Sequence, residues 1–341
     1  MYLNEKKINK LFFYWLASSL VLVFSIVIVG GLTRLTNSGL SITEWELFKG
    51  ILPPMSKNSW NIYFEQYKQI PQYKLLNSGM TLEEFKIIFY WEYYHRVLAR
   101  IIGLFFLIPL VYFYFTKKIN EKYLKMCLII FILIIFQGIV GWFMVKSGLI
   151  NETTVSHYRL STHLIIAFLI ICSIYWLLKN IKSNKFKYFF KFSYNNFLFQ
   201  LLIFLIFIQI IFGAFVSGLD AGKIYQTWPK MNETYFPNDF LYNNFYSFFD
   251  FDNHSLVQFY HRSLAYLIIF YAAFMSVYIY KKKLLHLYKS LLVFLIILFS
   301  QVLLGIITLV SGLNIYLAST HQITSVLLVL SALNLYYLRS K

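Results

Sequence analysis

Residues 92–115 have the sequence EYYHRVLARIIGLFFLIPLVYFYF. A helix of about 20 mostly apolar residues is long enough to cross the hydrocarbon core of a bilayer, and this run meets that requirement. Its first turns carry a carboxylate and a histidine, and ionisable groups inside a membrane usually serve a function. The run therefore indicates an integral membrane protein with functional groups near one end of a span.

Seven further runs are long and apolar enough to be spans. The eight runs are 11–31, 92–115, 125–145, 160–178, 197–219, 258–280, 290–310 and 317–338. The 341 residues are 59% hydrophobic and 13% charged, which excludes an ordinary soluble domain and a disordered chain. We predict an all-α integral membrane protein with eight transmembrane helices.

Lysine and arginine are distributed unevenly between the two sides of these spans. One side holds 17 of them in 49 residues: the N-terminus, 116–124, 179–196, 281–289 and the C-terminal tail. The other side holds 10 in 118 residues: 32–91, 146–159, 220–257 and 311–316. Because basic loops stay in the cytoplasm, both termini are expected inside and the long loops outside. The net charge of +17 then reflects topology, and we expect the lipid bilayer as a partner and no nucleic acid.

The first run follows Lys6, Lys7 and Lys10 but is too long for a signal peptide, and no small-residue cleavage site follows it. An Arg- and Ser-rich transit peptide is also absent. These features favour a multi-pass protein of the bacterial inner membrane. The two cysteines, Cys127 and Cys172, lie in apolar runs, so neither a disulfide framework nor a cysteine-rich zinc site is expected.

The two halves of the sequence resemble each other. The matching pairs are YHRVLA at 94–99 with YHRSLA at 260–265, LSTH at 160–163 with ASTH at 318–321, and QGIVG at 137–141 with QVLLG at 301–305. Each half contains four spans, so both halves have the same orientation. We therefore predict two tandem four-helix bundles related by a pseudo-two-fold axis along the membrane normal.

The predicted division places the first half at 1–178, including the long outer loop 32–91, and the second half at 197–341. Residues 179–196 form the cytoplasmic linker between them. Several glycines in the spans, among them Gly30, Gly141, Gly213 and Gly305, are interpreted as close-packing positions.

Four of the seven histidines lie in spans: His95, His163, His261 and His321. Each falls near the outer end of an even-numbered span, so all four share one depth, and the repeat pairs them. A single such histidine is most often a packed core residue, but four at matched depth indicate ligands. The remaining three, His157, His254 and His286, are interpreted as solvated loop residues.

Two histidines on facing helices of a four-helix bundle can hold the iron of a planar macrocycle between them. A zinc or copper site needs three or four converging ligands, whereas each half offers two. The pattern therefore predicts two bis-histidine haem sites, one in each half, near the outer face.

Glu92 is the one carboxylate that falls inside an expected span, three residues before His95 and on the same helix face. One interpretation places it just outside the membrane, paired with a loop lysine. The other places it in a low-dielectric pocket, as a base or charge stabiliser. The equivalent residue of the second half is Gln258, so the asymmetry assigns chemistry to the first half and electron transfer to the second.

Arg96 and Arg262 each follow a candidate ligand directly. Because guanidinium groups pair well with carboxylates, both are candidates to bind haem propionates. They could also extend to the membrane interface, and the two interpretations are compatible.

Several motifs of this chain resemble those of the haem A synthases, in their proteobacterial and mitochondrial branch. The motifs are GLTRLT at 31–36, SGLS at 38–41, EW at 44–45, PP at 53–54, MTLEEFK at 80–86 and WEYYHR at 91–96. The resemblance runs nearly end to end and is most specific in the outer loop 32–91. Gram-positive members carry a cysteine pair in outer loops, which this chain lacks.

The resemblance implies oxidation of the C8 methyl of haem O to the formyl of haem A, by successive hydroxylations with oxygen derived from water. It implies substrate haem at His95 and His163, a haem b cofactor at His261 and His321, and an essential glutamate at Glu92. Haem O synthase, a protohaem farnesyltransferase, would supply the substrate, and cytochrome c oxidase assembly would use the product.

Two rival functions remain open at the level of sequence. A di-haem b-type electron-transfer cytochrome would bind two haems without altering either, and the Glu92/Gln258 asymmetry argues mildly against it. A transporter built from parallel repeats would need charged or broken helices at the midplane, which the spans lack. The sequence leaves the electron acceptor and the oligomeric state open, with a homo-oligomer as one option.

Overall fold

The computed structural model describes residues 5–44, 49–189 and 191–340. Within these ranges the regular structure is helical, and the described residues form no strand beyond an isolated bridge between Met231 and Thr234. Eight of the described helices are long and apolar enough to cross a membrane. The prediction of an all-α integral membrane protein with eight spans is therefore confirmed.

The chain divides into two compact units, Met1–Leu178 and Lys179–Lys341. The pseudo-two-fold relation between the halves stays a prediction. The candidate spans of the first unit are α1 (Glu5–Leu35), α4 (Leu82–Thr116), α5 (Glu121–Asn151) and α6 (His157–Ser183), the last of which extends five residues beyond Leu178. Those of the second unit are α7 (Phe197–Gly218), α8 (His254–Lys281), α9 (Tyr288–Val310) and α10 (Ile315–Arg339).

Helix α4 begins ten residues before the expected start of its span. Thr81 is its N-cap: its hydroxyl accepts a hydrogen bond from the Glu84 backbone N–H, and the Glu84 carboxylate accepts one from the Thr81 N–H. The added turns are amphipathic, with charged residues on one face, so a hydropathy criterion does not detect them. Glu92 consequently lies well inside a continuous helix, not at its first turn.

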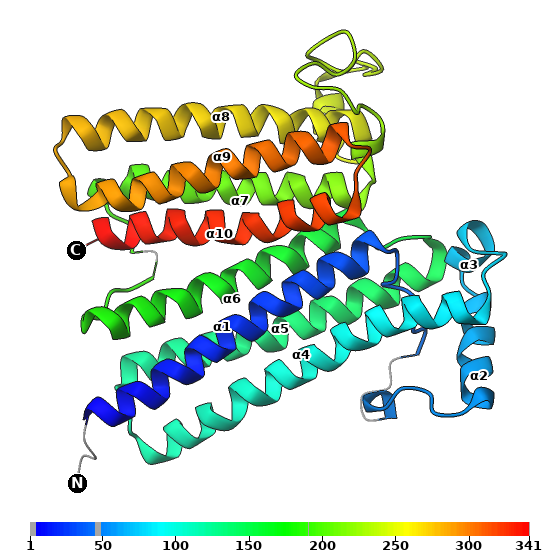
Figure 1. The fold of residues 1–341 in the computed structure, drawn as a ribbon, viewed down its shortest axis with the longest axis horizontal. Helices are drawn as coiled ribbons and strands as arrows, with labels where there is room; N and C mark the ends of the chain where they lie inside the picture. Colours follow the sequence, from blue (N-terminus) through cyan, green and yellow to red (C-terminus); the bar gives the residue numbers. More distant parts are fainter. Residues whose placement is uncertain (1–4, 45–48, 190, 341) are drawn as a thin grey trace. The chain divides into compact units, whose positions relative to one another are not determined.

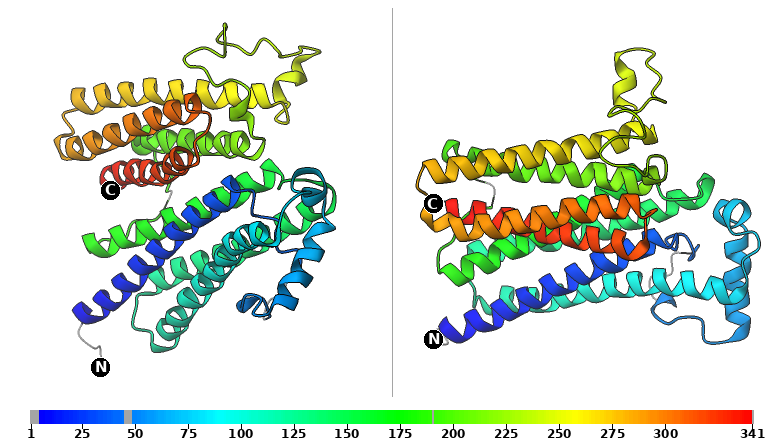
Figure 2. Two further views of the ribbon diagram at one scale, coloured as in Figure 1. Left: turned by 45° about the vertical axis from the view of Figure 1, so that its right-hand side comes forward. Right: turned by 45° about the horizontal axis from the view of Figure 1, so that its top comes forward.

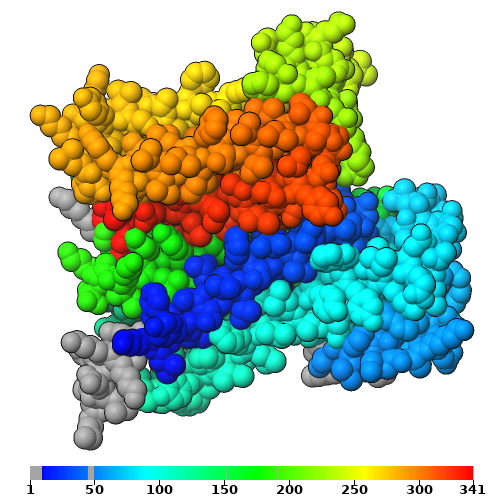
Figure 3. Space-filling view, in the orientation of Figure 1, coloured from blue at the N-terminus to red at the C-terminus, as the bar shows by residue number. Residues whose placement is uncertain are grey.

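The outer loop carries two short helices, α2 (Lys57–Lys68) and α3 (Pro71–Leu76); α2 packs against the start of α4, and α3 contacts α2 and α5. Helices α2 and α4 share a buried aromatic cluster, which we call the outer cap: Trp60, Phe64, Tyr67, Phe85 and Phe89. Figures 1 and 2 show α2 and α3 at the end of the first unit opposite the N-terminus. In the space-filling view they form one continuous surface with the start of α4 (Figure 3).

In the second unit, α7 packs on α8 and α9 packs on α10, and α10 also contacts α7. The segment between α7 and α8 lies at the end of this unit opposite the C-terminus (Figure 2). It contains the short 3-10 helices η3 (Ala221–Lys223) and η4 (Phe245–Phe249). The other short 3-10 helices of the chain are η1 (Lys49–Ile51), η2 (Tyr194–Asn196) and η5 (Leu285–Leu287).

The buried Tyr225 anchors the segment between α7 and α8 through hydrogen bonds. The Tyr225 hydroxyl lies 2.6 Å from Asp239 Oδ1 and 2.9 Å from Asn238 Oδ1, and the Ser255 hydroxyl donates to Asp239 Oδ2 at 2.6 Å. Desolvation acts to raise the pKa of Asp239, but the hydrogen bonds from Ser255 and Tyr225 outweigh it and hold the pKa below its ordinary value. The loop therefore depends on an ionised aspartate.

We expect this loop to loosen in acid. Because the pKa of Asp239 is lowered in the folded state, its contribution to stability is complete above the ordinary aspartate value of about 3.9 and is lost as the pH falls through the lowered value. Pepsin cleavage within residues 220–253 should rise over that interval. In Asp239→Asn, cleavage should already be faster at the upper end of this pH interval and should not rise further as the pH falls. A rise in cleavage equal to that of the parent would contradict the role assigned to Asp239.

Candidate functional site

The structure brings the four predicted ligands together as two pairs, one in each unit. In the first unit, His95 on α4 lies close enough to His163 on α6 for charges on the two rings to interact. The same holds in the second unit for His261 on α8 and His321 on α10. All four side chains are half-buried. The Nδ1 atoms of His163, His261 and His321 are buried and have no hydrogen-bond partner among the described residues.

Each of these imidazoles lies against a glycine of the preceding candidate span. A Cβ atom placed on that glycine would come unusually close to the ring in all four cases. The distances are 3.0 Å from Gly30 to His95 Nε2, 2.9 Å from Gly141 to His163 Cε1, 3.1 Å from Gly213 to His261 Cε1, and 2.9 Å from Gly305 to His321 Cε1. The glycines are therefore required by the site, and their interpretation as general close-packing positions was incomplete.

These features fit haem as the bound group. Two facing imidazoles in an apolar bundle are the usual axial ligands of a six-coordinate haem iron. The described residues form no cluster of three or more histidine, cysteine or carboxylate side chains that could hold a metal ion in another way. Pairs of histidines with buried, unpartnered ring nitrogens thus suit a macrocycle that supplies the remaining iron ligands itself.

A matched pair of glycines on α5 tests the role of the close approach. Gly141→Ala is expected to displace the His163 ring, because the new Cβ would lie 2.9 Å from Cε1. Gly138 lies one turn away on the same helix and would meet nothing within 4 Å. We expect Gly141→Ala to lose about half of the bound haem, as read from the reduced-minus-oxidised spectrum per protein. Gly138→Ala should keep all of it, since Gly→Ala in a helix is mildly stabilising, by about 0.5–1 kcal/mol. Equal haem contents would contradict this role.

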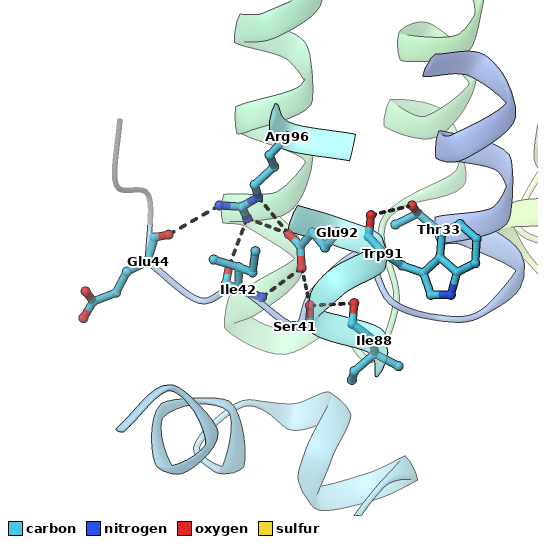
Figure 4. A network of polar contacts seen from close by, with 8 residues as sticks. All are labelled: Thr33, Ser41, Ile42, Glu44, Ile88, Trp91, Glu92 and Arg96. Atoms are coloured by element: carbon cyan, nitrogen blue, oxygen red, sulfur yellow. Dashed lines mark hydrogen bonds and ion pairs between the residues drawn. The ribbon is translucent and has the colours of Figure 1, made fainter. Parts of the chain in front are cut away.

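Glu92 lies at the centre of a buried polar network between α4 and the outer loop (Figure 4). Its Oε2 accepts hydrogen bonds from the Ser41 hydroxyl at 2.7 Å and the Ile42 backbone N–H at 2.8 Å. Its Oε1 accepts from Arg96 NH2 at 2.6 Å and Nε at 3.1 Å. The exposed fractions of the Glu92 and Arg96 side chains are 3% and 10%. These four hydrogen bonds fix the position of both oxygens of the carboxyl group.

Arg96 extends this network to the backbone of the loop. Its NH2 also donates to the Ile42 carbonyl at 2.9 Å, and its NH1 lies 3.4 Å from the Glu44 carbonyl. The ion-pair partner of Glu92 is thus the arginine one helical turn further along, so the alternative that paired it with a loop lysine was wrong. The propionate role of Arg96 stays a prediction; in this structure its guanidinium holds the outer loop.

The second unit repeats this arrangement without the charge pair. Gln258 Nε2 donates to the Tyr225 carbonyl at 2.9 Å, and Arg262 NH2 donates to the same oxygen at 2.7 Å. Arg262 NH1 donates to the Thr227 carbonyl at 2.9 Å. In both units, residues four apart on the second span bind the backbone of the preceding outer loop. Among the described residues, a carboxylate and a hydroxyl take part in this arrangement in the first unit and not in the second.

Sequence reasoning missed several participants. Ser41 is part of a motif that supported the family resemblance, but the sequence analysis gave it no role. Its contact with Glu92 could not be inferred from sequence, because the two residues lie 51 positions apart. His157 was expected to be solvated, but it is buried at the start of α6 with its ring beside Tyr158. His254 and His286 are exposed, as expected. Trp45 of the EW motif lies outside the described residues.

The fold and the paired histidines define a class: multi-pass helical membrane proteins with a two-histidine site in each half. A profile of the cytochrome oxidase assembly protein family matches residues 13–333. The chain is 48% identical to the haem A synthase of Pelagibacter ubique over 345 aligned positions, which cover 100% of both chains.

More distant relatives carry the same name. The haem A synthase of Bartonella henselae is 42% identical, with 93% of this chain and 89% of the relative covered. That of Rickettsia africae is 38% identical, with 95% and 96% covered. The chain therefore belongs to the haem A synthase family of cytochrome oxidase assembly proteins.

Proposed function

We propose that this protein is a haem A synthase, which oxidises the C8 methyl of haem O to a formyl group. The observation that carries the proposal is the duplicated histidine pair with a glycine against every ring, combined with Glu92, the one buried carboxylate among the described residues. In the proposal, His95 and His163 bind the iron of substrate haem O. His261 and His321 bind a haem b cofactor.

Each round of the proposed reaction removes two electrons and adds oxygen from water. The methyl group and one water give the hydroxymethyl group, two protons and two electrons. A second round gives the hydrated aldehyde, which loses water to leave the formyl group. Because His95 and His163 would both ligate the substrate iron in this proposal, they would leave no position for O2 to bind there, and water is the oxygen source consistent with that ligation.

Glu92 is the proposed acceptor of the methyl proton or stabiliser of the developing positive charge. It lies three residues before His95 on one helix face, and its hydrogen bonds fix its position. A charge placed in advance in a buried site stabilises a cationic transition state without reorganisation. Ser41 and Arg96 hold the carboxylate in place in this scheme.

Haem b bound in the second unit would supply one-electron redox chemistry. His261 and His321 are the residues that would hold it, and Gln258 at the position of Glu92 carries no group that exchanges protons. The proposal therefore assigns electron transfer to the second unit.

Pigment extraction tests the proposal against its rivals. The chain would be expressed beside a source of haem O, and haems extracted from the membranes would be separated by chromatography. A formyl-bearing haem that depends on the chain supports the synthase. Unmodified haem alone would support the di-haem cytochrome, and a purified protein without haem would support the transporter.

The proposed setting is the bacterial inner membrane, with both termini in the cytoplasm. It rests on eight candidate spans and on the excess of lysine and arginine in one set of loops. Haem O synthase would act before this protein and cytochrome c oxidase assembly after it. Reporter fusions at residues 341 and 240, active only in the cytoplasm or only outside it, test the orientation.

A further inference from the structure

The segment between α7 and α8 carries a group of large apolar side chains on its surface. Residues 240–249 have the sequence FLYNNFYSFF, which contains no charged residue. Five of its side chains are exposed by 56% to 80%, and we call them the apolar patch: Leu241, Tyr242, Phe245, Tyr246 and Phe249. Exposed apolar groups gathered in this way usually mark a surface that binds another molecule or a membrane.

Other side chains hold this segment near the outer ends of α7 and α8. The Tyr260 hydroxyl of α8 donates to the Phe248 backbone carbonyl at 2.7 Å. The centroid of the Phe251 ring lies 5.7 Å from that of Phe212 on α7 and 6.3 Å from that of Tyr260. The Phe248 ring lies 5.1 Å from the Phe240 ring. The apolar patch is thus the uncovered part of a segment that is otherwise packed on two spans.

The segment extends sideways from the second unit. Figures 1 and 2 show it projecting from the outer end of α8, across the direction of α7 and α8 and not along it. Because a transmembrane helix runs roughly along the membrane normal, a projection across the helix direction follows the membrane surface. The apolar patch therefore lies near the depth at which the spans leave the hydrocarbon core.

Several backbone groups of the run are satisfied within it. Ser247 Oγ accepts hydrogen bonds from the backbone N–H groups of Asn243 and Asn244, both at 3.2 Å. The Asn244 side-chain oxygen accepts from the Tyr246 N–H at 2.9 Å. An unpaired backbone group costs free energy in a medium without water. These hydrogen bonds therefore allow the turn that carries the apolar patch to enter a less polar environment.

We propose that residues 240–249 are an interfacial anchor, which inserts the apolar patch into the bilayer leaflet beside the outer ends of α7 and α8. Its phenylalanine and leucine side chains lie among the acyl chains, and its tyrosine hydroxyls lie at the level of the headgroups, where tyrosine is enriched in membrane proteins. Lipid already neighbours this unit, since α8 exposes Leu267, Phe270 and Phe274 along a candidate membrane span. The apolar patch continues that surface at the end of the helix.

Charge does not provide the attraction. Residues 220–257 hold five acidic and two basic residues, so the segment is not drawn to anionic headgroups. The nearest acids, Asp239 and Asp250, flank the run directly and mark the limits of what can enter the bilayer. Insertion therefore depends on the burial of apolar area and not on ionic strength.

The test measures the depth of a spin label in the full-length protein, reconstituted into phosphatidylcholine nanodiscs. Cys127 and Cys172, which are both buried, would be replaced by alanine. A nitroxide is then attached at Tyr246→Cys or at the control Glu233→Cys, an exposed charged position of the same segment. Power saturation compares collisions of each label with O2, which concentrates in lipid, and with a water-soluble nickel chelate.

We expect the label at position 246 to collide more with O2 than with the nickel chelate, and the label at position 233 to show the reverse. Raising the salt concentration should leave the depth at position 246 unchanged. Equal access of the nickel chelate to both labels would overturn the proposal. Shielding of position 246 from both reagents would also overturn it, because a second copy or another protein would then cover the apolar patch.

A second variant tests whether the apolar side chains themselves hold the segment in the bilayer. Phe245→Ser and Phe249→Ser, combined with the label at Tyr246→Cys, should raise the ratio of nickel to O2 collisions several-fold. Both rings are exposed and lie 5.4 Å from each other, so their removal leaves the packing on α7 and α8 in place. Tyr235→Ser, at an exposed position of the same segment outside the run, is the matched control and should leave the depth unchanged. An unchanged depth in the folded double serine variant would overturn the proposal.

Discussion

Glu92→Gln is expected to lower haem A formation by on the order of 100-fold or more while both haem sites stay loaded. The substitution copies the residue of the second half, Gln258, and keeps the shape of the side chain. It removes the negative charge and the capacity to take a proton. Its carbonyl oxygen can still accept from Arg96, so the outer loop keeps part of its attachment. Haem O or a hydroxylated intermediate should accumulate in extracted pigment.

The controls separate the chemical role of Glu92 from its structural one. Ser41→Ala removes one hydrogen bond to Oε2 but leaves the charge and the Arg96 ion pair. It should lower activity much less than Glu92→Gln. Glu92→Ala would leave Arg96 buried without its carboxylate, at a cost of about 3–5 kcal/mol, and is therefore a poor test of chemistry. Normal haem A output from a folded Glu92→Gln protein would remove Glu92 from the mechanism.

The second large effect is expected for the proposed iron ligands of the second unit. Simultaneous His261→Ala and His321→Ala should remove about half of the haem and abolish haem A formation. The first unit should still bind haem O, because its own pair, His95 and His163, is intact. Haem content, haem type and the Soret difference spectrum measured on the purified protein give all three results.

The matched control for this variant uses the histidines outside the pairs. His254→Ala and His286→Ala change exposed residues and should leave haem content and product formation unchanged. If the double variant retained a full complement of haem, the assignment of the second pair as iron ligands would be wrong. If the double variant lacked the haem of the second unit but formed haem A at the normal rate, electron transfer through the second unit would be ruled out.

Much of this fold follows from sequence, because the membrane imposes a strong rule. A span must be a long apolar helix, so eight apolar runs gave eight helices. The largest difference in a helix boundary lay at the start of α4, where Phe85 and Phe89 of the outer cap are interspersed with the charged residues Glu83, Glu84 and Lys86. Ten residues of helix outside an apolar run carry no hydropathy signal. The capping box at Thr81 and Glu84 was the available signal for the true start.

The site was less accessible than the fold. The histidines were identified from the internal repeat of the sequence, which shows which positions along the helices of the two halves are equivalent. Which group faces each ring depends on how neighbouring helices are rotated, and sequence alone does not give that rotation. The spacing Gln-x-x-x-Gly at 137–141, 209–213 and 301–305 was a visible signal that could have indicated it. The contact of Ser41 with Glu92 joins residues 51 apart and had no local pattern.

Helix α4 runs from Leu82 to Thr116 with Pro109 inside it, and the part before that proline carries both Phe85 and Phe89 of the outer cap and the proposed ligand His95. Each residue of an α-helix turns the chain by about 100°. Inserting or deleting one residue between Phe89 and Glu92 would therefore swing the imidazole to another side of the bundle if the cap stayed seated. The number of residues between the outer cap and His95 is therefore fixed by the rotation of the helix as well as by its length.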